Sequence, residues 1–345
     1  MIEKIMKLYR KYAVWLYFKI RKMAGSRKQR QILFLVLSPI LLIVCAWNFL
    51  FERMGKKICI DKCNDLDKNK HFSYDLIFVA IAKNEGSYIE EWIEYHRLVG
   101  VQKFIIYDNG STDNMKEVLQ PYIVKGIVDY VFLPGRAKQL DAYYDALLHY
   151  RKKAKLIGFF DLDEFVISVD KNKMLPDTVW DILQKYNKAA GVAINWYVYG
   201  SSGHKHRPQG LVTENYLYRA EDAYENNRCV KTIVNPRMVK GYIFDPHTPT
   251  YYCGYHSVTE KGHVVDGPWN EYPNNSYDKI RINHYYCKSV DEGKIKFERG
   301  LATHEQDIKN DWEKYARFDK NDIYDDIMMQ YVEKIWQALR DEERG

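Results

Sequence analysis

Short apolar runs that alternate with helical patterns constrain the fold of this chain more than any other feature of its sequence. After residue 74, five runs have the length and composition of buried strands: Leu76–Ala82, Lys103–Tyr107, Ile127–Phe132, Leu156–Phe160 and Val192–Trp196. Strands that alternate with helices are typical of a sheet whose strands are joined by crossover helices. We therefore predict an α/β domain.

The helices between these runs carry their own signals. Ser87 and Glu90 have the spacing of a capping box at the start of the first helix, and Gly100 is placed to end it. The Ala, Leu and Tyr content between residues 135 and 150 indicates a second helix. Pro176 is typical of the first turn of a third helix.

Polar residues follow three of the runs at the point where each strand should end. Asn84 and Glu85 follow the first run, Asp108 follows the second, and Asp161 and Asp163 follow the fourth. Ligands of open α/β sheets bind beyond the carboxyl ends of the strands, so we expect these residues to line one site. Two carboxylates one residue apart suit a divalent cation that carries a diphosphate. The adjacent Glu164 fits a structural role equally well.

These strand ends, taken in order, resemble the glycosyltransferases of the GT-A fold, a Rossmann-like nucleotide-sugar transferase fold with a mixed central sheet. Three later segments narrow the resemblance to glycosyltransferase family 92, formerly a domain of unknown function: Asn195–His204, Lys231–Pro236 and Ile282–Ser289. Lys296 and Arg299 follow them. The resemblance covers residues 75–300 and specifies a family without specifying a sugar.

The resemblance implies three groups of site residues. The residues implied near the nucleotide sugar are Asn84, Glu85, Asp108, Asp161, Lys231 and Lys288. The implied ligands of a Mn²⁺ or Mg²⁺ ion are Asp161, Asp163 and His284. Trp196 and His204 are expected beside the donor or acceptor sugar, since aromatic rings stack on sugars. The structural alternative is a hydrogen-bonded core histidine at 284 and an ordinary core strand at 196.

An inverting enzyme, which the resemblance implies, needs a carboxylate that removes the proton of the acceptor hydroxyl. The carboxylates at suitable distances after the Asp-x-Asp pair are Glu221, Asp222, Glu225 and Asp245, and their spacing does not separate them. Asp245 is favoured, with Asp222 second, because Phe244 and Pro246 could desolvate the Asp245 carboxylate and raise its pKa.

An uncharged apolar run of about twenty residues, Ile32–Phe51, precedes the domain and matches the thickness of a bilayer core. We predict a transmembrane anchor here, with a buried core helix as the alternative. The first thirty residues hold ten Lys or Arg and one acid, so the positive-inside rule places residues 1–31 in the cytosol. This gives a single-pass, Golgi-type type II protein in a eukaryote. In a bacterium, where the donor is cytoplasmic, we expect an inner-membrane protein with a cytoplasmic catalytic domain.

The predicted domains are a basic segment at 1–31, an anchor at 32–51, a stem at 52–74, a GT-A catalytic domain at 75–304 and a C-terminal helical extension at 305–345.

The expected function is metal-dependent transfer of a hexose, with galactose as the candidate, from a UDP-sugar to a glycan or glycolipid. The alternative is a catalytically inactive carbohydrate-binding or scaffold protein of the same fold. A dehydrogenase is disfavoured because no Gly-x-Gly-x-x-Gly opens the first helix. Nucleic acid is not an expected partner, since the basic residues do not continue into the folded part.

Overall fold

The computed structural model divides the chain into two units, Met1–Lys68 and Asn69–Gly345. The described residues are 31–46, 71–242, 245–252, 254–270, 275–299 and 312–344, with isolated positions before residue 30. In the first unit, residues 31–46 are helical, while residues 47–51 of the expected anchor and 52–70 of the expected stem lie outside the described residues. Within the described part of the chain, no helix is both long and apolar enough to span a bilayer. The anchor at 32–51 stays a prediction.

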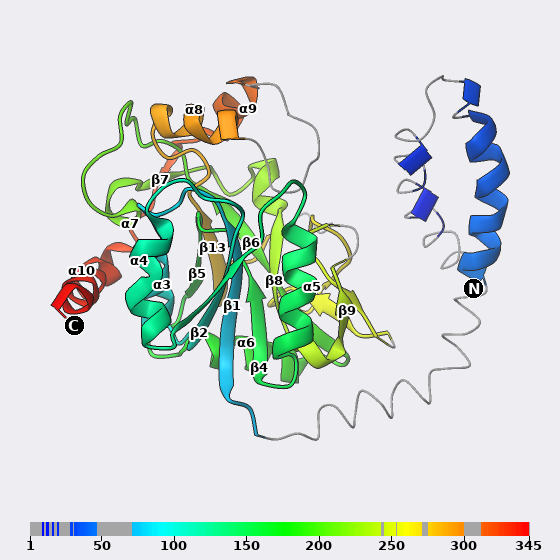
Figure 1. Ribbon diagram of the computed structural model, residues 1–345, viewed down its shortest axis with the longest axis horizontal. Helices are drawn as coiled ribbons and strands as arrows, with labels where there is room; N and C mark the ends of the chain where they lie inside the picture. Colours follow the sequence, from blue (N-terminus) through cyan, green and yellow to red (C-terminus); the bar gives the residue numbers. More distant parts are fainter. Residues whose placement is uncertain are drawn as a thin grey trace. The chain divides into compact units, whose positions relative to one another are not determined.

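A ten-stranded mixed sheet forms the centre of the second unit (Figure 1). The strands β1 (Tyr74–Ala82), β2 (Lys103–Asp108), β3 (Val128–Phe132) and β4 (Ala154–Phe159) are parallel to one another. All five predicted runs form strands, the fifth as part of β6 (Ala189–Val198). The predicted α/β domain with a mixed central sheet is therefore confirmed.

The order of the central strands is β6-β8-β4-β1-β2-β3. The strand β8 (Val230–Val234) is antiparallel to both β4 and β6, so β6 runs in the same direction as β4. The strand β13 (Ile280–His284) is parallel to β6 and antiparallel to β5 (Glu164–Ser168). The shorter strands are β7 (Tyr218–Arg219), β9 (Val239–Gly241), β10 (Thr250–Tyr251), β11 (His256–Val258), β12 (Val264–Val265) and β14 (Ile323–Tyr324).

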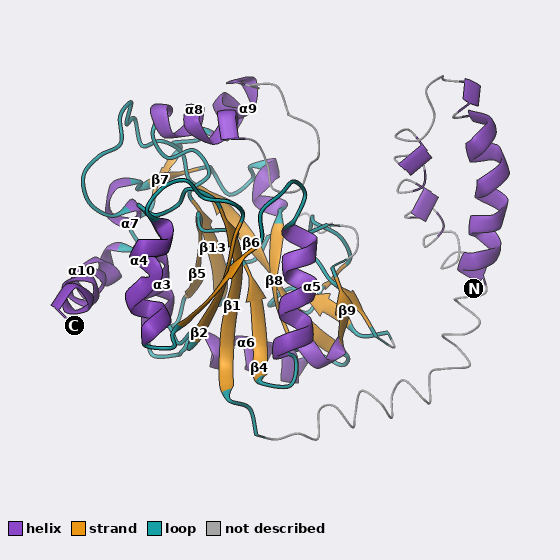
Figure 2. Ribbon diagram, viewed as in Figure 1, coloured by secondary structure: helices purple, strands orange, loops and turns teal. Residues whose placement is uncertain are grey.

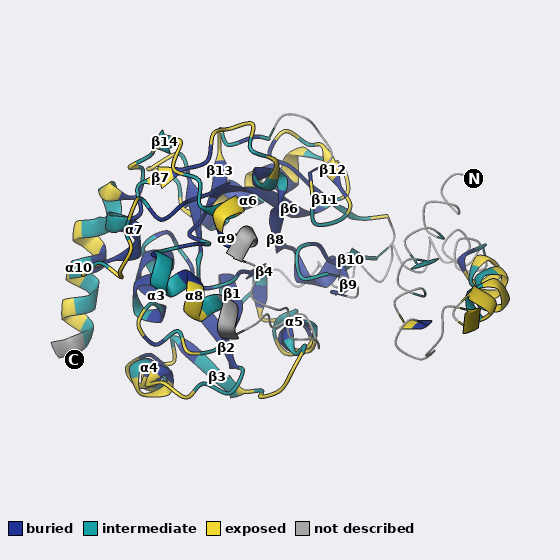
Figure 3. Cartoon of the chain, turned by 90° about the horizontal axis from the view of Figure 1, so that it is seen from above, coloured by how far each residue is buried: buried dark blue, intermediate teal, exposed yellow. Residues whose placement is uncertain are grey.

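Helices cover both faces of the sheet (Figure 2). Alternate side chains of a strand point to opposite faces. Phe78 of β1 accordingly belongs to a core with α3 (Ile89–Leu98), α4 (Met115–Val124) and α6 (Leu175–Lys185), whereas Val79 belongs to a second core with α5 (Gln139–Tyr150). Figure 3 shows the strands buried between these partly exposed helices. The remaining helices are α7 (Val212–Asn215), α8 (Val290–Arg299), α9 (Trp312–Phe318) and α10 (Met329–Arg344).

The helix signals of the sequence are confirmed with one exception. Pro176 lies in the first turn of α6, and Gly100 takes a positive φ of 106° just after α3. The capping box is absent, because α3 begins at Ile89 and its first residues are bonded differently. The carbonyl of Glu85 accepts hydrogen bonds from the amides of Tyr88 and Ile89, both at 3.0 Å. A backbone turn thus replaces the side-chain cap.

The C-terminal segment is joined to the α/β domain by a strand as well as by helices. The strand β14 pairs with β7, and α10 packs against α3. Asp319 and Asn321 accept the amides of Ser201 and Ser202 at 2.6 and 2.7 Å. Residues 312–344 therefore support the loop that follows β6.

His96 joins α3 to β5 as a neutral, fully buried ring. Its Nδ1 lies 2.8 Å from the carbonyl oxygen of Trp92, and its Nε2 accepts the Val166 amide at 3.1 Å. Burial lowers the pKa of His96 to about 3. Because the unfolded chain titrates near the usual value of about 6.5, it binds more protons than the folded chain between these two pH values. Stability should therefore fall on acidification below about pH 6.5.

We expect His96→Phe to lower the free energy of unfolding at pH 7. Between pH 6 and pH 4, the slope of that free energy against pH should be smaller in the variant by about 1.4 kcal/mol per pH unit. Denaturant unfolding of both proteins across this range would measure the two slopes. Identical slopes for the two proteins would show that His96 is not the group responsible.

Candidate active site

The ends of the central strands bring most of the predicted site residues to one edge of the sheet. The parallel strands β1, β2, β4, β6 and β13 end there, and the antiparallel β8 begins there. In Figure 1 this edge is the upper one, beneath α8 and α9. The predicted residues at these strand ends are Asn84, Glu85, Asp108, Asp161, Asp163, Trp196, Lys231 and His284.

Lys231 is an almost completely buried lysine at this edge. Its side chain is 1% exposed, and its Nζ lies 2.9 Å from Oδ2 of Asp161 and 3.4 Å from Oε2 of Glu164. Burial alone would lower the pKa of Lys231, but the two carboxylates raise that pKa well above its usual value. Burial raises the pKa of Glu164 to about 8. Asp161 is therefore the main counter-ion of Lys231 at neutral pH.

Asp163 points to a different set of partners. Its Oδ2 is 2.6 Å from Nζ of Lys296 on α8, and its Oδ1 is 3.5 Å from Nε2 of His284. Burial would raise the pKa of Asp163, but Lys296 and His284 hold it well below its usual range. The pKa of His284 is lowered by burial. The two carboxylates of the Asp-x-Asp pair thus each have a separate lysine partner.

Buried polar atoms without partners concentrate near these residues. Six such side-chain atoms occur in the described part of the chain, and three of them are Glu164 Oε1, Trp196 Nε1 and His284 Nδ1. Leaving a buried polar group unpaired costs about 1–3 kcal/mol, so buried polar groups without a partner are rare. A water or a ligand bound at this edge would supply the missing partners.

A model of glycosyltransferase family 92 matches residues 81–320 of the chain. The chain belongs to glycosyltransferase family 92. This confirms the family predicted from the motifs.

The relatives of this family 92 protein are distant. A glycosyltransferase family 92 protein of Ricinus communis is 27% identical over 239 residues, which are 69% of this chain and 40% of that protein. A galactan β-1,4-galactosyltransferase of Arabidopsis thaliana is 35% identical over 111 residues, 29% of this chain and 21% of that protein. The chain spans about 40% of the length of the family 92 relatives that it matches. The crystal structure of S. aureus TarS 1-349 in complex with UDP aligns with 14% identity and a TM-score of 0.32 over 47% of each chain.

Lys288 extends the charged edge of the family 92 protein towards the start of α3. Its Nζ lies 3.4 Å from the centre of the Tyr88 ring and 3.8 Å from Oε2 of Glu85. Burial lowers the pKa of Lys288. The predicted nucleotide residues Glu85 and Lys288 are therefore brought together.

Asn84 and Asp108 mainly connect neighbouring loops. Asn84 has a positive φ of 57°, and its Oδ1 accepts the Thr112 amide at 2.7 Å. The Asp108 carboxylate accepts the Ser111 amide at 2.7 Å and the hydroxyl of Tyr130. Both residues lie at the predicted edge, with side-chain oxygens that already serve the turn after β2.

His204 and Asp222 make their contacts away from the two carboxylate clusters. His204 Nε2 lies 3.2 Å from the carbonyl oxygen of Asn215, near α7. The Asp222 side chain is 68% exposed and bonds to Arg219 at 2.8 Å. Asp245 is closer to the clusters, because its Oδ1 accepts the amide of His247 at 2.9 Å, and the His247 ring packs on Trp196.

Three residues at the edge were not predicted to act there: Gln139, Lys296 and His247. Gln139 Nε2 donates to Oδ1 of Asp161 at 2.9 Å from the first turn of α5. Its place after β3, where a crossover helix begins, is a signal that sequence reasoning could have used. Lys296 is one of the family motif residues, but nothing in its spacing indicates that it contacts Asp163. His247 follows Asp245 by two residues, and no pattern in the sequence indicates that it packs on Trp196.

The predicted metal ligands are only partly assembled. Among the described residues, no three His, Cys, Asp or Glu side chains are grouped to hold a metal ion. Asp161 faces Lys231 and Gln139, so it does not join the other two predicted ligands. Asp163 Oδ1 and His284 Nε2 are 3.5 Å apart, which suits two ligands that each lie about 2.1 Å from one ion. The Asp163 and His284 pair therefore fits a divalent cation.

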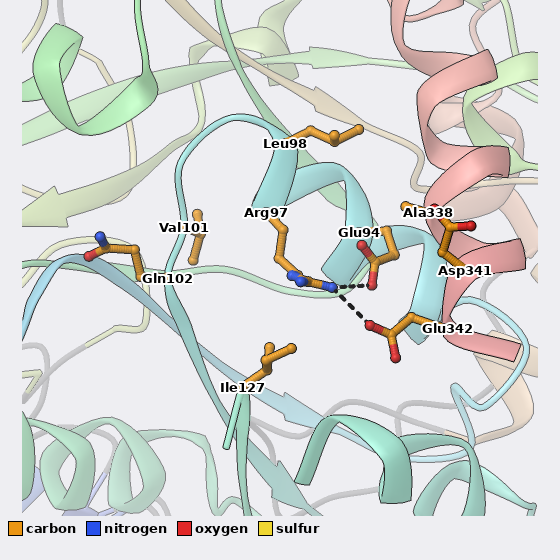
Figure 4. Close-up of a pocket in the computed structure, with 9 residues that line it drawn as sticks. All are labelled: Glu94, Arg97, Leu98, Val101, Gln102, Ile127, Ala338, Asp341 and Glu342. Atoms are coloured by element: carbon orange, nitrogen blue, oxygen red, sulfur yellow. Dashed lines mark hydrogen bonds and ion pairs between the residues drawn. The ribbon is translucent and has the colours of Figure 1, made fainter. Parts of the chain in front are cut away.

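A separate cavity of about 520 Å³ lies near the opposite edge of the sheet (Figure 4). It is lined by α3, α10 and the residues that precede β2 and β3. Arg97 crosses it and pairs with Glu94 at 2.7 Å and Glu342 at 3.2 Å. This cavity contains none of the predicted site residues.

Proposed function

We propose that this family 92 protein transfers a hexose from a UDP-sugar to a glycan or glycolipid acceptor with inversion. The observation that carries the proposal is the pair of carboxylate and lysine clusters, Asp161 with Lys231 and Asp163 with Lys296, at the strand ends. Galactose is the candidate sugar, because one similar protein is a galactan β-1,4-galactosyltransferase.

The charges at this edge suit a diphosphate that arrives together with a cation. Lys231, Lys288 and Lys296 each have a carboxylate within 3.8 Å. A diphosphate can replace these carboxylates as the partner of the lysines, while the released carboxylates take up cationic charge. Preorganised ammonium groups in a buried site would then stabilise the charge that develops on the leaving diphosphate.

The proposed cofactor is Mn²⁺ or Mg²⁺, held by Asp163 and His284. Their separation of 3.5 Å supports a shared ion. Asp161 is the candidate for an indirect contact with that ion, through the bound UDP-sugar. When bound, the ion would supply positive charge that makes the diphosphate a better leaving group. Lys296 must release the second oxygen of Asp163 if both oxygens are to serve the ion.

The test is UDP release by the full chain with a panel of UDP-sugars, in Mn²⁺, in Mg²⁺ and in a chelator. Metal-dependent release from one donor would support the proposal and identify the sugar. Release that the chelator leaves unchanged would remove the metal from the proposal while keeping the transferase. Absence of both UDP release and UDP binding would favour the catalytically inactive carbohydrate-binding protein.

Asp245 is the proposed base, and Asp222 the second candidate. Asp245 Oδ1 is occupied by two backbone amides at 2.9 Å, and its Oδ2 has no hydrogen-bond partner among the described residues. We expect Asp245→Asn to lower kcat for transfer by about a hundredfold or more, since general bases contribute about 10²–10⁴. UDP binding should be unchanged. Asp222→Asn is the matched comparison, and a larger loss in that variant would reverse the assignment.

The membrane anchor remains part of the proposal. The helix at residues 31–46 carries exposed apolar side chains, including Leu35 at 70% and Ile43 at 67% exposure, which supports contact with lipid. We propose a single-pass protein of the Golgi type in a eukaryote, or an inner-membrane protein with a cytoplasmic catalytic domain in a bacterium. Membrane fractionation of the full chain and of a variant without residues 32–51 tests this.

A further inference from the structure

Three aromatic rings connect the Asp245 loop to the proposed metal ligands. The ring centres of Trp196 and His284 are 4.1 Å apart, and those of Trp196 and His247 are 5.6 Å apart. His247 therefore lies one ring away from His284, in the segment between β9 and β10. Its position next to the active edge is set by packing on Trp196.

The hydrogen bonds of His247 determine which ring nitrogen carries the proton. Nδ1 lies 2.8 Å from the carbonyl oxygen of Val230, and a carbonyl oxygen can only accept. Nδ1 must therefore be the N–H donor, which leaves Nε2 as an unprotonated acceptor. Burial, together with the charge of Lys231, lowers the pKa of His247 to about 4, so the ring is neutral at pH 7.

The backbone holds this ring in a fixed place. The amide of His247 donates to Asp245, and its carbonyl accepts the Thr232 hydroxyl at 3.1 Å. Nε2 has no hydrogen-bond partner among the described residues. The neighbouring Trp196, which is 7% exposed, has an indole N–H that also lacks one. An acceptor and a donor without protein partners therefore lie on two rings whose centres are 5.6 Å apart.

We propose that Nε2 of His247 accepts a hydrogen bond from a hydroxyl of a bound sugar. The inference rests on the proposed transferase function and adds a specificity-determining residue to it. Phosphate oxygens at neutral pH are mainly acceptors and cannot satisfy Nε2, whereas sugar hydroxyls donate and accept. A sugar hydroxyl can therefore donate to Nε2, which a phosphate oxygen cannot do.

The test compares His247→Phe with wild type, using the full chain. Phenylalanine keeps a ring against Trp196 but removes the acceptor, and His247→Gln offers an oxygen in its place. We expect His247→Phe to lower kcat/KM by about ten- to a hundredfold, with affinity for UDP and Mn²⁺ within about twofold of wild type. His247→Gln should recover part of the loss. His149→Phe, an exposed histidine on α5, is the matched control.

The assay arms distinguish the two sources of the hydroxyl. If His247→Phe slows hydrolysis of the donor in the absence of acceptor, the recognised hydroxyl belongs to the transferred sugar. A loss only in transfer, with a raised KM for the acceptor, assigns it to the acceptor. Unchanged kcat/KM in His247→Phe would overturn the inference, as would weakened Mn²⁺ binding, which would make His247 a metal ligand.

Failure of the proposed function would look different from failure of this inference. A wild-type protein that neither binds UDP nor releases it would reject the transferase itself, and the role of His247 with it. Thermal unfolding of each variant separates loss of folding from loss of recognition. If His247→Phe unfolds at a lower temperature than wild type, His247→Gln is tested instead with a series of donors that each lack one hydroxyl. Wild type and His247→Gln should differ least in kcat/KM on the donor that lacks the recognised hydroxyl.

Discussion

Asp163→Asn is expected to lower UDP-sugar turnover by about a thousandfold, the upper end of the loss caused by removing one preorganised electrostatic group. Asparagine keeps the size of the side chain but removes the charge that faces both Lys296 and His284. Affinity for Mn²⁺ should fall together with kcat, because a neutral amide is a poorer ligand for a hard cation. UDP release and Mn²⁺ binding measure the two effects.

The matched control for this variant is Asp181→Asn. Asp181 also pairs with a lysine, Lys173, but its side chain is 65% exposed and lies on α6, away from the strand ends. UDP-sugar turnover by Asp181→Asn should match that of wild type. Near-normal turnover in Asp163→Asn would mean that Asp163 serves the structure alone.

Lys231→Met is expected to lower kcat/KM by about a hundredfold, because a buried ammonium group at the proposed diphosphate site is lost. Methionine fills similar space without charge. The variant should lose little folding stability, since the Asp161 side chain is 40% exposed and can be solvated. Glu164 should stay largely neutral, because burial raises its pKa to about 8 even with Lys231 present. Steady-state kinetics and thermal unfolding would separate the two effects.

Lys103→Met is the matched control for a buried, paired lysine. Lys103 is 7% exposed, lies 2.6 Å from Asp129, and donates to the Gly126 carbonyl at 2.7 Å at the start of β2. It is thus buried in a similar way at the opposite edge of the sheet. Lys103→Met should lose stability while the folded protein keeps its kcat. Equal kinetic losses in both variants would point to a general structural effect.

The strands and their polar ends were predictable because both depend on local sequence. An apolar run such as Leu76–Ala82 indicates a buried strand wherever it is placed. Parallel strands bring their carboxyl ends to one edge, so Asp161 was expected near Glu85 without knowledge of the strand order. The capping box at Ser87 was a wrong prediction, because the Glu85 carbonyl satisfies the first amides of α3. A local sequence pattern does not show which other groups compete for the same backbone amides.

The sequence by itself determined the α/β alternation, the acidic and basic residue types at the strand ends, and the family. Only the tertiary structure decided which of these charges meet. Lys231 is 70 residues from Asp161, and Lys296 is 133 residues from Asp163. These pairs exist because antiparallel β8 begins where β4 ends and because α8 lies above that edge. A contact between distant residues depends on strand order and helix placement, which the packing of the whole domain sets and no local pattern encodes.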